Sequence, residues 1–232
     1  VTNTPVHSEV ALVAEHTVAL ILGLQKRLHL YAGGWLQAGR WKDPAAMSAA
    51  IRGATVGIVG FGQIGRSVAE RLRPWGATLL ATDVREPEPL EGVTFVDFDT
   101  LLRRSDVVTL HTPGRPMGSP ALIDERALDL MKPSAVLINT ARGNLVDTSA
   151  LVARLAGGGL AGAGLDVFNP EPPEPEAPLL QLPNVLLTPH VAAWNPGVRK
   201  EMAQMAFENL WSMFEGRVPP HLVNREVVEG AR

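Results

Sequence analysis

Residues 55–72 read TVGIVGFGQIGRSVAERL, an apolar run that breaks at a glycine-rich turn and continues as a helical segment. This order predicts a strand, a tight turn and a helix. Gly60 permits the tight turn, Gly62 lets a pyrophosphate approach the backbone, and Gly65 allows the helix to pack closely against its strand. The free backbone N–H groups that open the helix would then face a diphosphate.

A glycine-rich turn also arises for purely steric reasons, so the segment that follows it matters. Residues 77–83 read ATLLATD, which predicts a second buried strand that ends in an acid, Asp83, eighteen residues after Gly65. This is near the spacing of a carboxylate that binds the adenosine ribose of a dinucleotide. Asp83 would also repel a 2′-phosphate, which favours NAD over NADP, whereas Arg85 acts against a strict preference. The alternative interpretation of Asp83 is a solvated turn acid.

The composition is that of a soluble globular protein. The chain has 232 residues, of which 46% are hydrophobic, and this allows one large α/β domain or two small ones. The formal net charge is −3 and the chain has no lysine-rich tract, so we expect no basic surface that could bind nucleic acid. The chain has no cysteine, which removes disulfides, thiolate nucleophiles and cysteine–zinc sites, and we expect no metal. Because this composition fits a reducing compartment, we expect a cytoplasmic protein.

The most apolar segment lies near the start of the chain. Residues 11–24 are interrupted by Glu15 and His16, and no small-residue cleavage site follows them. We therefore predict a buried helix from Ser8 to about His29, with Ser8 as its N-cap, and no membrane anchor. Because apolar residues surround most of this helix, it needs neighbours on several sides.

A loop rich in glycine and tryptophan follows this helix. The segment Gly33–Trp41 contains Trp35 and Trp41, whose large and partly polar rings suit a subunit interface. Together with the apolar helix over residues 8–29, the loop predicts a homodimer. Packing of both tryptophans within their own domain is an equally open alternative.

Strands and helices alternate through the rest of the chain. Apolar runs predict strands at 106–111, 134–140, 160–165 and 184–188. Helices are expected at 99–104, 123–131, 147–155 and 196–214. The proline-rich residues 170–178 are too few for a linker between domains and are interpreted as a stiff loop. Successive βα units predict an α/β fold, a Rossmann-type doubly wound parallel sheet over about 54–190, with long helices at both ends and ligands at the carboxyl ends of the strands.

Three polar side chains fall just beyond predicted strand ends: Arg142, Glu171 and His190. Oxidation of a secondary alcohol needs a base for the hydroxyl proton, a nicotinamide to accept hydride, and a cation if the substrate carries a carboxylate. His190 can be the base, Glu171 can favour its protonated form, and Arg142 can hold the carboxylate with two parallel hydrogen bonds. Taken singly, each residue has an ordinary alternative role as a core-capping histidine, a solvated glutamate or a surface arginine.

Four motifs, in order along the chain, resemble the D-isomer-specific 2-hydroxyacid dehydrogenases. They are GFGQIGR at 60–66, NTARGNLVD at 139–147, GAGLDVFNPEP at 162–172 and TPH at 188–190. The resemblance extends over essentially the whole chain and implies that residues 1–232 are an NAD-binding domain with hinge helices at both ends. Members of this family begin with a flavodoxin-like substrate domain of about a hundred residues, so we expect that an upstream substrate domain is missing here.

The resemblance also assigns roles by position. It makes His190 the acid/base, Glu171 its partner and Arg142 the ligand of the substrate carboxylate. It implies that the cofactor is bound by Gly60, Gly62, Gln63, Ile64 and Gly65 at the pyrophosphate turn, Asp83 at the adenosine ribose, Asp166 at the nicotinamide amide, and Thr112, Pro113, Thr140, Ala141, Arg142 and His190 along the cleft. His111 lies close to the cleft, and a structural role is expected for it.

The function implied by the resemblance is the NAD-dependent interconversion of a D-2-hydroxy acid and its 2-oxo acid. Phosphoglycerate, glycerate, glyoxylate and lactate all remain open as substrates. GRPMG at 114–118 departs from the usual Leu-Thr-x-x-Thr stretch of the family, so no cofactor contact is assigned there. The alternative function is an NAD(H)-sensing, dehydrogenase-like interaction module without turnover. Without a substrate domain, the chain is expected to bind cofactor but to turn over poorly.

Overall fold

The computed structural model describes residues 1–232 except 7, 33, 86–87, 225 and 227–232. Contacts between residues divide the chain into two compact units. The larger unit is residues 13–192, and the smaller unit joins residues 1–12 with residues 193–232. The sheet and every predicted site residue belong to the larger unit.

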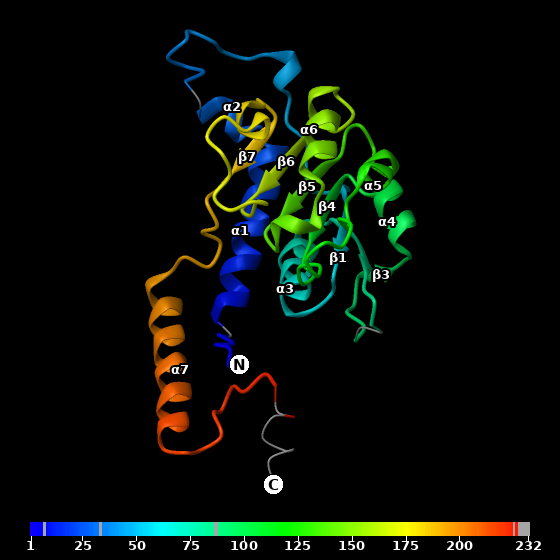
Figure 1. The fold of residues 1–232 in the computed structure, drawn as a ribbon. Helices are drawn as coiled ribbons and strands as arrows, with labels where there is room; N and C mark the ends of the chain where they lie inside the picture. Colours follow the sequence, from blue (N-terminus) through cyan, green and yellow to red (C-terminus); the bar gives the residue numbers. More distant parts are fainter. Residues whose placement is uncertain (7, 33, 86–87, 225, 227–232) are drawn as a thin grey trace. The chain divides into compact units, whose positions relative to one another are not determined.

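Strands of the larger unit form one fully parallel, seven-stranded sheet in the order β3-β2-β1-β4-β5-β6-β7 (Figure 1). They are β1 (Thr55–Val59), β2 (Thr78–Thr82), β3 (Val93–Phe95), β4 (Val107–Leu110), β5 (Val136–Asn139), β6 (Gly162–Leu165) and β7 (Val185–Leu187). The strand order reverses between β1 and β4, which is the switch point where doubly wound sheets bind ligands. The predicted Rossmann-type sheet is confirmed. Strand β3 is not indicated by the sequence, because two of its three residues are exposed and no apolar run marks it.

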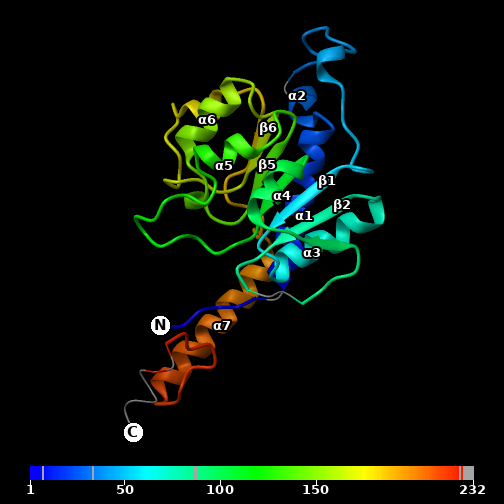
Figure 2. The same cartoon turned by 90° about the vertical axis from the view of Figure 1, so that its right-hand side faces the viewer.

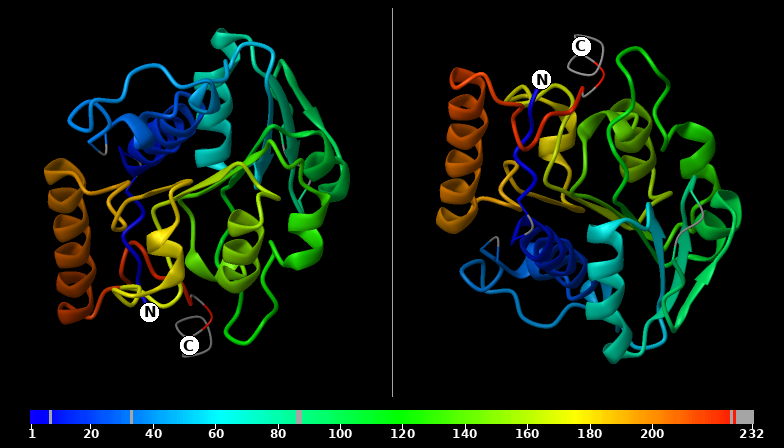
Figure 3. Two further views of the ribbon diagram at one scale, coloured as in Figure 1. Left: turned by 90° about the horizontal axis from the view of Figure 1, so that it is seen from above. Right: turned by 90° about the horizontal axis from the view of Figure 1, so that it is seen from below.

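Helices cover both faces of the sheet (Figure 2). They are α1 (Ser8–Gln25), α2 (Leu28–Ala32), α3 (Gln63–Leu72), α4 (Phe98–Arg104), α5 (Glu125–Leu130) and α6 (Thr148–Ala156). Residues of α1 and α3 form one buried cluster with the sheet, and residues of α4, α5 and α6 form another on the opposite face (Figure 3). Successive strand residues such as Val107 and Val108 belong to opposite clusters, as the alternation of side chains in a strand requires.

Aspartates cap the three helices on the face opposite α1 and α3. Asp97, Asp124 and Asp147 precede α4, α5 and α6, and each accepts a hydrogen bond from a backbone N–H group in the first turn. Caps of this kind stabilise a helix by about 1 kcal/mol. The predicted helices are confirmed, with ends that differ by one or two residues.

The predicted helix over residues 8–29 is confirmed as far as Gln25 and is wrong in its last turn and in its cap. Helix α1 ends at Gln25, and Arg27 has a φ of 57°, which breaks the helix before α2. The backbone of Gln25 and the side chain of Lys26 both bond to Ala49, so a neighbouring loop fixes the break. Ser8 is not the cap but the first helical residue. Most residues from 13 to 25 are buried, with Glu15 and Ala19 exposed, and this confirms the prediction of a buried helix.

The two tryptophans of the loop after α2 differ in burial. Trp35 is only 8% exposed, its Nε1 donates to the carbonyl oxygen of Trp41 at 2.7 Å, and its ring packs edge-on against Tyr31. The interpretation of Trp35 as an exposed interface residue is therefore wrong, because its own loop covers it. Trp41 is 74% exposed. Gly33, the first residue of the predicted loop, lies outside the described residues.

The smaller unit is built on α7 (Pro196–Phe214), which confirms the predicted C-terminal helix. Asn209 of this helix is buried, and its side chain donates to the carbonyl oxygen of Asn3 and accepts from the backbone N–H of His221. One buried amide therefore ties both ends of the chain to the same helix.

The close contact between β1 and α4 gives the first prediction. Gly57→Ala should lower the free energy of unfolding by about 1–3 kcal/mol, because the added methyl group would overlap Ser105 and Leu101. Gly62→Ala is the matched control, since a Cβ there meets no atom within 4 Å, and its stability should stay within about 1 kcal/mol of wild type. Urea unfolding measures both variants. Equal stability of Gly57→Ala and wild type would contradict the packing.

Candidate active site

The predicted catalytic residues gather at the carboxyl edge of the sheet. Arg142 follows β5, Glu171 follows β6 and His190 follows β7. These strands are neighbours and parallel, so their loops lie side by side. The glycine turn follows β1 and Asp83 follows β2 at the same edge.

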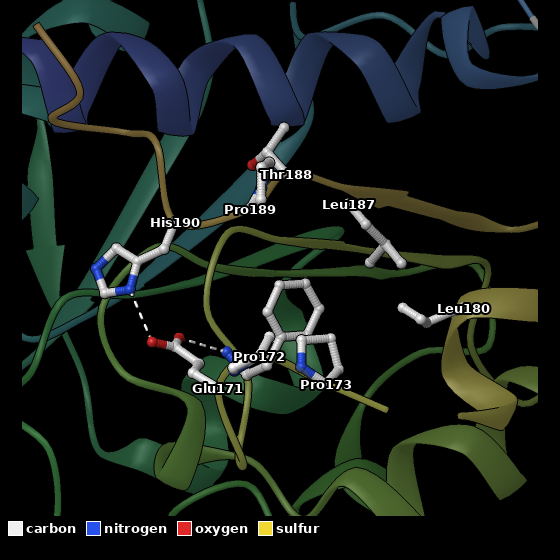
Figure 4. Close-up of a pocket in the computed structure, with 9 residues that line it drawn as sticks. Glu171, Pro172, Pro173, Leu180, Leu187, Thr188, Pro189 and His190 are labelled. Atoms are coloured by element: carbon white, nitrogen blue, oxygen red, sulfur yellow. Dashed lines mark hydrogen bonds and ion pairs between the residues drawn. The ribbon is translucent and has the colours of Figure 1, made fainter. Parts of the chain in front are cut away.

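Glu171 and His190 form a hydrogen-bonded pair (Figure 4). Nδ1 of His190 lies 2.9 Å from Oε2 of Glu171, and the other carboxylate oxygen accepts a hydrogen bond from the backbone N–H of Phe168 at 2.8 Å. The two residues are thus within hydrogen-bonding reach, as predicted from the sequence.

Electrostatics keep Glu171 ionised. Burial alone would raise the pKa of Glu171, but the Phe168 amide, the hydrogen bond and charge of His190, and the charge of Arg142 together lower it. An ionised carboxylate only accepts hydrogen bonds, so Nδ1 of His190 carries a proton and Nε2 is left for a substrate. Figure 4 shows Nε2 on the side of the ring away from Leu187.

The turn that carries Arg142 is shaped by a buried amide. Asn139 is 1% exposed, and its side chain donates to the carbonyl oxygen of Arg142 at 2.8 Å and accepts from the N–H of Ala141 at 3.0 Å. Gly143 then lies directly against the backbone of Phe168, where any Cβ would overlap the carbonyl oxygen. This contact joins the turn to the loop after β6, which carries the glutamate. Arg142 itself is exposed.

Asp166 lies beneath the loop of His190. Its side chain is fully buried and accepts hydrogen bonds from the Thr188 hydroxyl at 2.5 Å and from the N–H groups of Val191 and Ala192 at 2.9 Å each. These bonds hold the chain on both sides of His190, whose φ of 56° lies in the left-handed region. Three donors therefore occupy most of the carboxylate's acceptor positions. The contact of Asp166 with a nicotinamide amide stays a prediction.

The glycine turn fits a dinucleotide diphosphate. Gly60 has a φ of 91°, and a Cβ on it would come within 2.6 Å of the His111 carbonyl oxygen. Gly65 lies against the carbonyl oxygen of Gly60, which any side chain would overlap. Gly62 precedes α3 without a side-chain cap and faces open space. The backbone N–H groups at the start of α3, including Gln63 and Ile64, are thus available to a diphosphate.

Asp83 stands next to this turn. Its carboxylate accepts hydrogen bonds from the backbone N–H groups of Phe61 at 2.7 Å and Arg85 at 3.0 Å. Burial alone would raise the pKa of Asp83, but these amides and the charge of Arg85 lower it. An ionised carboxylate retains acceptor positions for ribose hydroxyls, so the residue fits its predicted role.

The remaining predicted cleft residues lie on the loops after β4 and β5. The Thr112 methyl group lies 2.8 Å from the place of a Cβ on Gly60, so it borders the glycine turn, and Pro113 beside it is exposed. The Thr140 hydroxyl lies 2.8 Å from that of Thr17 in α1. The backbone N–H of Ala141 donates to the side-chain oxygen of Asn139.

His111 has the structural role that was expected. Its Nε2 lies 2.9 Å from the hydroxyl of Thr109, and burial lowers the pKa of His111 to about 3. The imidazole of His111 is therefore uncharged near neutral pH.

The segment 114–118, which departs from the family pattern, supports the turn of Arg142. A Cβ on Gly114 would lie 3.1 Å from the side chains of both Arg142 and Asn144. The Asn144 amide in turn bonds to the backbone N–H and carbonyl of Arg115. This segment therefore packs against Arg142.

An apolar cavity of about 510 Å³ lies beside the catalytic pair (Figure 4). It is lined by the pair and by apolar side chains that include Phe168, Leu180 and Leu187. Figure 4 shows Nε2 of His190 pointing away from Leu187, one of the residues that line the cavity.

Sequence reasoning missed the side chains that hold these loops. They are His16, Thr17, Asn139 and Thr188. The available signal was a polar side chain inside or at the end of an apolar run. Such a signal gives no partner. The partners of His16 and Thr188 lie far away in the sequence, as does the Thr140 partner of Thr17, whereas Asn139 bonds within its own turn.

Comparison with known proteins agrees with this geometry. The family profile described as D-isomer specific 2-hydroxyacid dehydrogenase, NAD binding domain, matches residues 18–192. A glyoxylate reductase of Thermococcus litoralis is 40% identical over 238 residues, which cover 98% of this chain and 71% of that protein. A solved structure from Thermus thermophilus is 40% identical with a TM-score of 0.86, covering 96% of this chain and 70% of that one. The NAD complex of a D-isomer specific 2-hydroxyacid dehydrogenase from Lactobacillus delbrueckii is 36% identical with a TM-score of 0.84, covering 96% and 72%.

The chain spans about 70% of the length of these relatives. Its uncapped glycine turn and ionised Asp83 fit NAD, the cofactor named in both the family profile and a solved neighbour. The chain therefore belongs to the D-isomer-specific 2-hydroxyacid dehydrogenase family, and its parallel sheet is the NAD-binding domain of an oxidoreductase that acts on hydroxy acids.

Proposed function

We propose that this chain carries the residues that interconvert a small D-2-hydroxy acid and its 2-oxo acid, with His190 as the acid/base. The observation that carries the proposal is the 2.9 Å contact between Nδ1 of His190 and Oε2 of Glu171 at the carboxyl edge of the sheet. The names of two relatives, both glyoxylate reductases, make glyoxylate the first substrate to test.

In this proposal, Arg142 binds the substrate carboxylate. Its planar guanidinium can donate two parallel hydrogen bonds, which orient the 2-oxo acid as well as bind it. NADH, when bound, supplies the hydride that adds to C2. His190 donates the proton on Nε2 to the carbonyl oxygen, which completes the hydroxyl group of the product. In the reverse direction, Nε2 accepts that proton from the hydroxyl group.

Glu171 fixes the tautomer of His190 and favours its protonated form. Because the pKa of Glu171 is lowered, its carboxylate stays ionised well below neutral pH. The acceptor for the proton on Nδ1 of His190 is therefore present at neutral pH and is lost only as the pH falls through the lowered pKa of Glu171.

The catalytic pair gives the second prediction. His190→Asn should lower kcat for glyoxylate reduction by about 10²- to 10⁴-fold, because no group remains to protonate the carbonyl oxygen. Glu171→Gln keeps the shape but loses the charge, so it should cost less in kcat and move the midpoint of the pH profile of kcat/KM to lower pH. Steady-state kinetics with NADH from about pH 5 to 9 measure both effects.

The assay uses this chain and any longer natural protein that contains it. His221→Asn, in the smaller unit, is the control for loss of a histidine. Unchanged turnover in His190→Asn would refute the assignment. Tight NADH binding by the longer protein, without turnover of any 2-oxo acid in a panel, would instead support the NAD(H)-sensing alternative.

The ribose carboxylate gives the third prediction. NADH should bind at least about tenfold more tightly than NADPH, a difference of about 1.4 kcal/mol, because the ionised Asp83 repels a 2′-phosphate. Asp83→Asn removes this repulsion and should lower the ratio of the NADPH to the NADH dissociation constant. Arg85→Ala should leave this ratio unchanged or raise it. Fluorescence titration gives the dissociation constants. Equal or tighter binding of NADPH by wild type would contradict the preference.

A homodimer is proposed from the exposed apolar side chains of one loop. Leu36, Trp41 and Met47 are 65%, 74% and 73% exposed. Exposed apolar side chains gathered in one segment are typical of subunit contacts. We propose that this loop packs against a second copy of the chain.

The fourth prediction tests this contact. The double substitution Trp41→Ser and Met47→Ser should convert a dimer into a monomer, because it removes two of the exposed apolar side chains. Trp75→Ser, which removes a tryptophan that is 42% exposed elsewhere, should leave the dimer intact. Light scattering at micromolar concentration measures the mass. A monomeric wild type would overturn the proposal.

A further inference from the structure

We propose that the His16–Thr17 turn of α1 positions the two loops that carry the chemistry. Thr188 links this turn to the loop of His190. Thr140 links it to the loop of Arg142. The inference rests on the proposed function, because it concerns the placement of the acid/base and of the carboxylate ligand.

The first link is a directed chain of hydrogen bonds. Nε2 of His16 lies 2.9 Å from Oγ1 of Thr188, and that hydroxyl donates to Asp166 at 2.5 Å. A hydroxyl group has one proton, so Oγ1 of Thr188 must accept from His16. The proton of His16 is therefore on Nε2, and the chain of bonds runs from the helix to the buried carboxylate.

This series of hydrogen bonds ends on the backbone around His190. A residue other than glycine keeps a positive φ only where its surroundings hold it there, and His190 has a φ of 56°. Asp166 binds the side chain of Thr188, two residues before the histidine, and the N–H groups of Val191 and Ala192 directly after it. The backbone is thus fixed on both sides, while the imidazole remains free to meet the substrate.

The second link joins the next residue of α1 to the other loop. Thr17 is fully buried, and its hydroxyl donates to the carbonyl oxygen of Val13 at 2.8 Å. The hydroxyls of Thr17 and Thr140 lie 2.8 Å apart. Because the only hydroxyl proton of Thr17 is used on Val13, Thr140 must be the donor to Thr17. Thr140 follows β5 and precedes Arg142 by two residues. One turn of α1 therefore holds both loops.

Packing of α1 on the sheet does not need these polar groups. The same helix contacts the sheet through the buried side chains of Val18, Ile21 and Leu24. Buried hydroxyl and imidazole groups cost free energy unless they are bonded, so apolar residues would serve packing better. The bonds that His16 and Thr17 make to the loops account for their presence in this apolar helix.

The kinetic test separates the two links. Thr188→Val should lower kcat for 2-oxo acid reduction by about 10- to 100-fold, with the dissociation constant of NADH changed less than about twofold. Thr188→Ser restores the hydroxyl and should recover most of kcat. Thr17→Val acts on the arginine side and should raise KM for the 2-oxo acid by about tenfold, with little change in kcat.

Hydrogen exchange provides a readout that does not depend on turnover. In Thr188→Val and in His16→Phe, the N–H groups of Val191 and Ala192 should exchange at least about tenfold faster. Exchange in the core of β4 and β5 should stay as in wild type. Ser105→Ala is the matched control, because it removes a buried hydroxyl that bonds only within its own helix end.

The outcomes distinguish this inference from the proposed function. Absence of turnover in the longer wild-type protein, together with faster exchange at Val191 and Ala192 in both variants, would refute the proposed function and keep the positioning network. Unchanged exchange at these two N–H groups would overturn the inference, whatever the kinetics. A loss of kcat in Thr188→Ser equal to that in Thr188→Val would also overturn it, because the hydroxyl would then have no part.

Discussion

Parallel pairing of the strands is the constraint on which the rest of this structure depends. Each strand must be followed by a crossover that returns the chain to the opposite edge, so the segments after the strands collect at the carboxyl edge. Asp83, Arg142, Glu171 and His190 lie far apart in the sequence, yet each comes directly after a strand of the same sheet. Crossovers on both sides also bury both faces, which accounts for the two separate hydrophobic clusters.

Close approaches of backbone determine how tightly those segments pack. At Gly60 the backbone faces the His111 carbonyl oxygen, and at Gly143 it faces Phe168, with no room for a side chain at either place. The first contact shapes the diphosphate turn, and the second joins the arginine turn to the glutamate loop. Glycines therefore shape the site as much as polar side chains do. Both glycines lie in motifs of the sequence, but only the motif of Gly60 indicates a close approach of backbone.

Patterns of apolar and polar residues in the sequence predict the strands, the helices and the order in which they alternate. Apolar runs locate the buried strands, and their alternation with helices gives the fold and the edge where Glu171 and His190 meet. The break at Arg27 depends on bonds to a distant loop, so an apolar pattern that continues past it cannot reveal it. The burial of Trp35 depends on its own loop folding back, and the bonds of Asp166 depend on which segment lies above it. The helix break, the burial of Trp35 and the bonds of Asp166 depend on tertiary contacts, so composition and spacing do not predict them.

The Glu171–His190 pair shows why that tertiary part matters for the geometry of the site. The side chains of His190 and Glu171 are 53% and 36% exposed, so burial cannot be what places them. Their positions come instead from the backbone, through the Phe168 N–H at the glutamate and through the buried Asp166 under the histidine. Water screens an exposed pair and weakens its electrostatic effect, whereas a cleft closed around substrate strengthens it. The geometry is thus set before substrate arrives, and the electrostatic contribution of the pair grows only when water leaves.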